Sequence, residues 1–168
     1  MDKESKGLMS LLEKAEVDEA LKYAEGMKDS RKASEILSDF AVAVVKHLYD
    51  YEIAEKLLKK AVSINPKDAR SFFNLGVLYT EPALSIRDEA RLADAERAYL
   101  RALKLKPDYL EAHYNLALFY HFLGRDDEAE LEYAVFSDIC DDKELVGGLK
   151  KVLSKKIRKI DLGRYMMD

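Results

Sequence analysis

The side chains able to do chemistry are few in this chain, and their spacing does not assemble a catalytic site. The 168 residues contain three histidines, His47, His113 and His121, and one cysteine, Cys140. His113 and His121 are eight residues apart, which on one helix separates them by about 12 Å. A zinc ion holds its nitrogen ligands at about 2 Å, so these two cannot share one. We expect His113 to be a packed core residue instead.

Neighbouring carboxylates at positions 126–128 and 141–142 are the other candidates for acid–base chemistry. They fall at predicted helix starts, where acidic side chains stabilise the helix dipole. The sequence shows no glycine-rich phosphate loop, nucleophile elbow or zinc motif. Cys140 has no suggestive histidine close in sequence and is expected to be a structural thiol. We therefore predict no enzymatic activity, no cofactor and no metal.

Composition narrows the possible partners and the compartment. The net charge of −4 disfavours nucleic acid as a main partner. A lone cysteine excludes an internal disulfide and fits a reducing compartment. The longest purely apolar run, 40–45, is far shorter than the ~20 residues of a membrane span. We expect a cytoplasmic protein without a membrane segment. Because glutamine is absent and charges are abundant, we also hypothesise a thermophilic source.

Two segments 41 positions apart repeat each other. Residues 72–79, FFNLGVLY, resemble residues 113–120, HYNLALFY. Elsewhere apolar residues recur every three or four positions, as in helices, and the runs are interrupted at Asn65-Pro66, Lys106-Pro107 and Gly124. Self-similarity of this kind predicts stacked helical hairpins, each of which buries its apolar face only against its neighbours.

The spacing resembles the tetratricopeptide repeat, a helix-turn-helix unit of 34 residues. The matching large, small and aromatic positions are His113, Leu116, Ala117, Tyr120, Ala129 and Tyr133 in one copy and Phe72, Leu75, Gly76, Tyr79, Ala95 and Tyr99 in the other. Weaker copies begin at 35 and at the N-terminus. The resemblance implies an all-α fold, a right-handed superhelix of stacked hairpins. It is expected to pack through Ala54, Leu75, Gly76, Tyr79, Ala95, Leu116, Ala117, Tyr120 and Ala129.

The register divides the chain into a single solenoid of five segments. These are a degenerate hairpin (1–34), a repeat (35–68), a repeat with seven extra residues (69–109), a repeat (110–143) and a basic amphipathic capping helix with a tail (144–168). The extra residues lie between Thr80 and Asp94. We expect Pro82 to end one helix near Glu81, and Ser85 to cap the next helix over about 86–105.

The last segment is predicted to be interrupted by Gly147-Gly148 before a basic helix over 149–160. Its apolar stripe should cover Tyr133, Phe136 and Ile139, as the end of a repeat stack requires. A basic amphipathic helix of this type can also contact anionic lipid or nucleic acid.

In tetratricopeptide proteins the first helices of successive repeats line a concave face. The resemblance therefore implies a groove formed by Phe73, Val77, Glu81, Glu111, Tyr114, Leu118, His121 and Phe122. The repeat over 35–68 adds Asp39, Ala43, Lys46 and His47. Such a groove suits an extended or helical peptide.

Asn74 and Asn115 match an asparagine of the family's clamp for chaperone C-termini. Asp39, Phe73 and Val77, however, stand where that clamp needs lysine or asparagine. The sequence thus predicts a noncatalytic scaffold that binds a protein or peptide. The alternatives are a self-associating structural subunit such as a homodimer, and a scaffold whose basic C-terminal helix contacts nucleic acid or anionic lipid.

Overall fold

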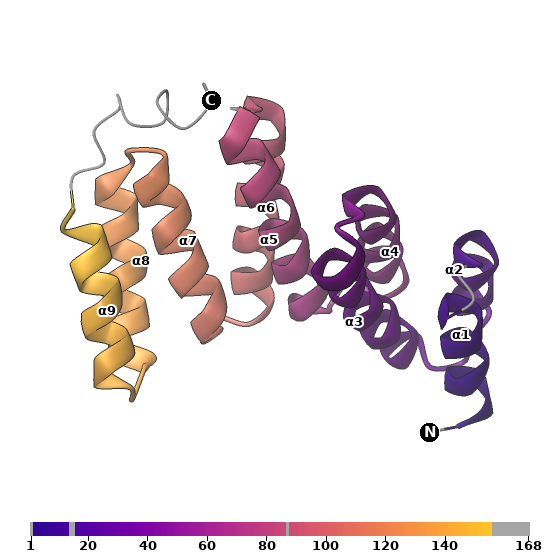
Figure 1. The fold of residues 1–168 in the computed structure, drawn as a ribbon. Helices are drawn as coiled ribbons and strands as arrows, with labels where there is room; N and C mark the ends of the chain where they lie inside the picture. Colours follow the sequence, from indigo (N-terminus) through magenta and orange to yellow (C-terminus); the bar gives the residue numbers. More distant parts are fainter. Residues whose placement is uncertain (1, 14–15, 87, 156–168) are drawn as a thin grey trace. The chain divides into compact units, whose positions relative to one another are not determined.

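The computed structural model describes residues 2–13, 16–86 and 88–155, which form nine α-helices and no strand (Figure 1). The helices are α1 (Lys3–Glu13), α2 (Val17–Glu25), α3 (Ser30–Leu48), α4 (Tyr51–Ile64), α5 (Ala69–Ile86), α6 (Glu89–Leu105), α7 (Leu110–Phe122), α8 (Asp126–Ile139) and α9 (Lys143–Leu153). The predicted all-α fold class is confirmed.

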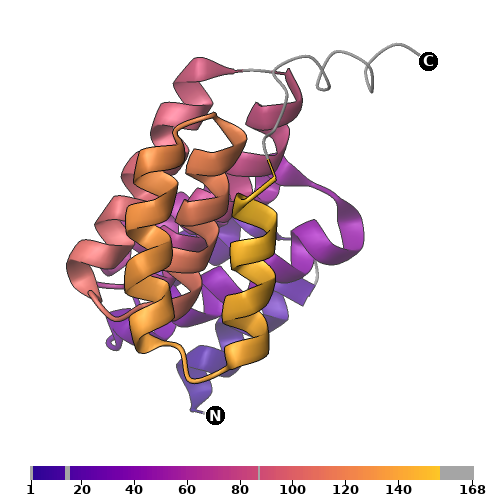
Figure 2. The ribbon, with the colours of Figure 1, turned by 90° about the vertical axis from the view of Figure 1, so that its left-hand side faces the viewer.

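The helices gather into two compact units, Met1–Pro107 and Asp108–Asp168. In the first unit, α1–α2, α3–α4 and α5–α6 form consecutive hairpins. The first helices of these hairpins lie side by side, since α3 contacts both α1 and α5, while α2 contacts α4. In the second unit, α7 and α8 form a hairpin and α9 packs along both (Figure 2).

Aspartates set the starts of several helices. Asp29, Asp50, Asp88 and Asp142 each accept a hydrogen bond from a backbone N–H in the first turn of α3, α4, α6 or α9. Such caps satisfy N–H groups that have no partner within the helix. The acidic cluster 126–128 occupies the first turn of α8. The carboxylates that looked like candidates for acid–base chemistry therefore stand at helix starts, as predicted.

The seven extra residues lengthen both helices of their hairpin. Helix α5 continues through Pro82 to Ile86, so the prediction that it ends near Glu81 was wrong. Asp88, and not Ser85, caps α6. An internal proline removes one helical hydrogen bond, but the extended hairpin buries Ala83 completely. Helices α5 and α6 have 18 and 17 residues, whereas α7 and α8 have 13 and 14.

The glycine pair does not interrupt the last helix, which was also predicted wrongly. Helix α9 runs through Gly147 and Gly148, because glycine in a helix costs only about 1 kcal/mol and Leu149 is buried against Ala117 and Phe136. Tyr133 packs against the same cluster, and Ile139 is half-buried. Helix α9 ends at Leu153 and not at the predicted residue 160, while residues 156–160 and the tail after them lie outside the described residues.

The predicted packing residues are all buried, and one pair shows how closely the helices approach. The aromatic ring of Tyr99 on α6 lies against Gly76 on α5. The Thr80 hydroxyl donates to the Gly76 carbonyl oxygen at 2.7 Å and lies 3.2 Å from the Tyr99 hydroxyl. A small residue on one helix thus makes room for an aromatic ring from the other.

Candidate partner-binding surfaces

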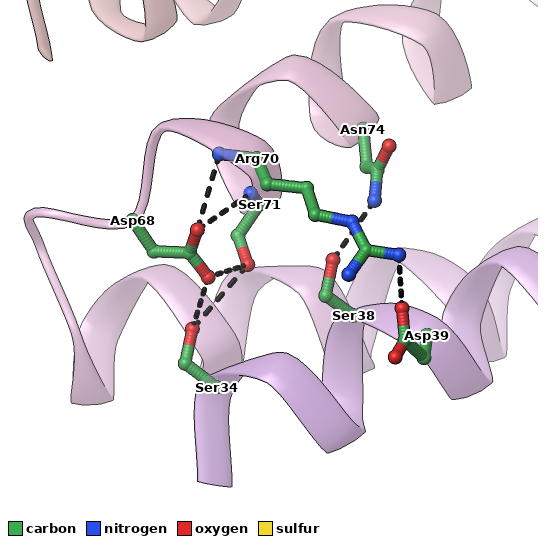
Figure 3. Close-up of polar contacts among 7 residues, drawn as sticks. All are labelled: Ser34, Ser38, Asp39, Asp68, Arg70, Ser71 and Asn74. Carbon is green, nitrogen blue, oxygen red and sulfur yellow. Dashed lines mark hydrogen bonds and ion pairs between the residues drawn. The ribbon is translucent and has the colours of Figure 1, made fainter. Parts of the chain in front are cut away.

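A buried polar cluster fastens α3 to the start of α5 (Figure 3). One carboxylate oxygen of Asp68 accepts hydrogen bonds from the hydroxyls of Ser34 and Ser71, both at 2.6 Å. The other accepts from the backbone N–H groups of Arg70 and Ser71, at 3.1 and 3.3 Å. Both serines are fully buried. Asp68 therefore begins α5 and holds it against α3.

The same helix pair is joined again one turn further along. The Asn74 side-chain amide donates to the Ser38 hydroxyl at 2.9 Å, and Arg70 forms an ion pair with Asp39 (Figure 3). The corresponding amide of Asn115 donates to the backbone carbonyl of Glu111 at 2.8 Å. Both asparagine amides thus make contacts within the protein itself.

Next to these polar contacts between α3 and α5, an apolar cleft of about 190 Å³ opens between α3, α4 and α5. We call it the α3–α5 cleft. It is lined by Ala41, Val42, Val45, Lys46, Tyr51, Leu58, Asn74, Val77 and Leu78. Val42 and Val77 are 45% and 42% exposed. Lys46 is the one charged residue in this lining. The cleft therefore offers aliphatic surface to water on the side formed by the first helices.

A second polar cluster joins α4, α5 and α6. Glu55 lies 3.2 Å from the Tyr79 hydroxyl, 2.6 Å from Lys59 Nζ and 3.3 Å from an Arg91 guanidinium nitrogen. Burial alone would raise the pKa of Glu55, but the hydrogen bond from Lys59 and the charges of Lys59 and Arg91 hold it below its ordinary value. Burial and the neighbouring Glu55 raise the pKa of Tyr79. An ionised carboxylate with three donors is a structural clamp, not a general acid.

In the second unit, a cleft of about 260 Å³ lies where α7, α8 and α9 meet. We call it the Tyr114 cleft. It is lined by Leu110, Glu111, Tyr114, Asn115, Phe136 and Leu145. The Tyr114 ring meets the Phe136 ring edge-on, with centroids 5.4 Å apart. Tyr114 is thus both a wall of this cleft and part of the core beneath α9.

The two histidines of α7 are buried and held by carboxylates. His113 Nδ1 lies 2.6 Å from Glu132 Oε2, which confirms its prediction as a core residue. His121 is 3% exposed, with Nδ1 at 3.1 Å from Asp126 Oδ1. It borders a separate cavity of about 230 Å³ between α8 and α9. Within the described ranges, no group of three or more histidine, cysteine or acidic side chains is placed to hold a metal ion.

The model of the tetratricopeptide repeat family matches residues 87–124. That stretch of the chain carries a tetratricopeptide repeat. The predicted resemblance to the family is confirmed. Helices α5 and α7, which hold the two similar sequence segments, begin at Ala69 and Leu110. Comparison with curated protein sequences finds no match.

Two solved structures share the tetratricopeptide fold of this chain at low sequence identity. One is described as a point mutant of MamA, with 21% identity, a TM-score of 0.53, and coverage of 83% of this chain and 96% of that one. The other comes from the functional characterisation of Pseudomonas aeruginosa pilF, with 19% identity, a TM-score of 0.60, and coverage of 96% and 71%. At these identities the likeness concerns the fold alone.

The tetratricopeptide groove residues predicted from sequence differ in their exposure. Val77, Glu111 and Phe122 are exposed; Phe73, Tyr114 and Leu118 are half-buried; His121 is buried. The side chain of Glu81 lies outside what the structure describes. In the repeat over 35–68, Lys46 lines the α3–α5 cleft, while Asp39 is paired with Arg70.

Sequence reasoning missed Val42, Tyr51 and Leu145 as lining residues. Val42 stands at the position that holds Gly76 and Ala117 in the two later repeats. Its larger side chain is the signal from which the sequence could have identified it. Leu145 belongs to the start of α9, ahead of the break that was expected at Gly147-Gly148. No helix within the described ranges is both long and apolar enough for a transmembrane span.

Proposed function

We propose that this protein is a noncatalytic tetratricopeptide scaffold that binds another protein through the first helices of its hairpins. The α3–α5 cleft is the main anchoring site, and the Tyr114 cleft is a second one in the other unit. The lone cysteine and the absence of a disulfide partner for it support a reducing, cytoplasmic location.

The observation that carries this proposal is exposed aliphatic surface in a concave, apolar site. Val42 and Val77 stand on neighbouring first helices and remain close to half exposed. Burying such side chains contributes about 25 cal/mol per Å² of apolar area. Peptides bound by helical grooves are held through apolar anchors of this kind.

Double substitution of Val42 and Val77 by lysine tests the proposal. Both side chains are partly exposed, so the variant should keep its helical circular dichroism and melting temperature. We expect it to lose partners that the wild-type chain captures from host lysate, as identified by mass spectrometry. The matched control is Leu100→Lys on α6, a residue with 45% exposure outside both clefts. Undiminished capture by the double variant would reject the assignment of the cleft.

Self-association is a second candidate function, favoured by the outer face of α8. Leu131 and Val135 are 68% and 41% exposed there. In the two preceding repeats the same positions hold basic residues: Lys56 and Lys60 in one, Arg97 and Arg101 in the other. Helix α8 contains no basic residue, whereas α9 carries three lysines. The α8 face of one copy therefore suits the α9 face of another by apolar contact and by charge.

Sedimentation velocity over a range of protein concentrations and salt tests this candidate. Wild-type protein should associate reversibly, and salt should weaken the association because it screens exposed charges. Replacing Leu131 and Val135 by arginine, the residue type found at 97 and 101, should leave a folded monomer. A wild-type chain that stays monomeric at every concentration would exclude self-association.

A further inference from the structure

We propose that the α3–α5 cleft accepts an aromatic side chain of the partner, with an acidic group beside it. The ring would lie beside the Val42 side chain, in the gap between two helices that the protein's own tyrosine fills in the next repeat. This inference rests on the proposed function, since it specifies which kind of residue anchors there.

The surroundings of Tyr99 show what a filled site looks like. The Tyr99 ring, which is almost completely buried, lies on Gly76, and its hydroxyl lies 3.2 Å from the Thr80 hydroxyl. Gly76 and Thr80 both belong to the first helix of that repeat, and Tyr99 to its second. One repeat thus closes the gap between its two helices with its own aromatic ring.

The preceding repeat has the same three positions without the ring. Thirty-four residues before Gly76 and Thr80 stand Val42 and Lys46, and the position of Tyr99 corresponds, after the seven extra residues are removed, to Leu58. Val42, Lys46 and Leu58 all line the α3–α5 cleft. The cleft therefore lies where the repeat lacks its tyrosine, because a leucine side chain is too short to fill the space.

The size and chemistry of the cleft fit a ring. An apolar protein cavity of about 150 Å³ is known to hold benzene, and this cleft measures about 190 Å³. Its lining is aliphatic apart from Lys46, Tyr51 and Asn74.

Charge selects what should accompany the ring. Lys46 has no carboxylate partner among the described residues. An ammonium group at the rim of an apolar site favours a negative charge next to the bound ring. A tyrosine or phenylalanine flanked by an acidic residue, or ending in a carboxylate, meets both requirements.

Methyl NMR of the full chain tests the inference with two probes that need no knowledge of the partner. These are 4-methylphenol, a tyrosine side-chain analogue, and 4-hydroxyphenylacetate, the same ring with a carboxylate. We expect saturable ring-current shifts at the methyl groups of Val42, Val77 and Leu78, in the millimolar range. The carboxylate probe should bind more tightly, and Lys46→Met should remove its advantage.

The matched variant rebuilds the filled site. Val42→Gly combined with Leu58→Tyr copies the Gly76–Tyr99 pair, and should weaken binding of either probe at least about tenfold while preserving the fold. If that double variant is not folded, Leu58→Phe alone serves the same purpose. Shifts confined to other methyl groups, or none at all in the wild type, would overturn the inference. If the Val42/Val77 lysine variant loses partner capture while neither probe binds the wild-type chain, this inference is wrong and the proposed function still holds.

Discussion

The ring of Tyr99 lies so close to Gly76 that a Cβ atom on residue 76 would stand 2.7 Å from two of its ring carbons. Real Cβ atoms essentially never approach so closely, and a ring that is 1% exposed in a close-packed interior can shift only at a cost. This contact fixes the distance between α5 and α6.

Gly76→Ala should therefore destabilise the protein although alanine favours helices. We expect a loss of about 1–3 kcal/mol in the free energy of unfolding, as for other overpacked cores, measured by urea denaturation. Gly147→Ala on α9 is the control, because no atom lies within 4 Å of its added Cβ. That substitution should stabilise by about 0.5–1 kcal/mol. Equal effects of the two substitutions would refute the packing argument.

Asp68→Ala should cost more than the loss of an ordinary helix cap. It removes the cap of α5 and also the carboxylate that accepts from both buried hydroxyls, so that Ser34 and Ser71 keep only their weaker contact with each other at 3.3 Å. A cap is worth about 1 kcal/mol, and unsatisfied buried groups add about 1–3 kcal/mol. Asp29→Ala, which removes only an exposed cap of α3, is the comparison in denaturant titrations. A similar loss in both variants would show that the contacts of Asp68 with Ser34 and Ser71 contribute nothing to the free energy of unfolding.

Stability should fall at high pH because of Tyr99. Burial raises the pKa of Tyr99 to about 12, against an ordinary value of 10.0, with the hydrogen bond to Thr80 opposing the shift. The unfolded chain therefore loses this proton first. The stability present below pH 10 should decline by up to about 3 kcal/mol as pH rises towards 12.

Tyr99→Phe should flatten this alkaline decline, whereas Tyr23→Phe, at an exposed tyrosine, should not. Thermal melts at several pH values between 9 and 12 would measure it. An unchanged slope in the Tyr99 variant would contradict the assignment.

Glu55 should contribute stability that is lost at low pH, whereas the contribution of Tyr99 is lost at high pH. Its pKa in the folded protein is held below the ordinary 4.5 by Lys59 and Arg91, despite the opposing effect of burial. The unfolded state therefore binds the proton more readily, and the stability it provides above its unfolded pKa is lost as pH falls through the folded value. Glu55→Gln should reduce the acid sensitivity of the melting temperature between pH 6 and 3. Identical pH profiles would rule out the cluster as an electrostatic clamp.

Local patterns in the sequence predicted the parts of the fold that depend on periodic burial. The spacing of Leu116, Ala117 and Ala129 was sufficient to place α7 and α8, because a helical hairpin requires small and large residues at those intervals. The path through Pro82 was not predictable, since the cost of a proline is local while the burial of Ala83 depends on the whole hairpin. The same reason explains the intact α9.

The candidate site was predicted less well than the fold. Repeat register alone identified Val77 and Lys46, but it did not show that Leu58 leaves space beneath Val42. A cleft is a missing volume, which depends on the side chains from three helices together. His121 shows the converse, because a position expected on an open face is buried beside Asp126.

Site-specific photocrosslinking in the native host tests the central claim most directly. A photoreactive phenylalanine analogue placed at Val77, within the α3–α5 cleft, should crosslink to a discrete partner protein. The same analogue at Leu100, equally exposed on α6, should not. Crosslinks from position 100 but none from position 77 would contradict the account.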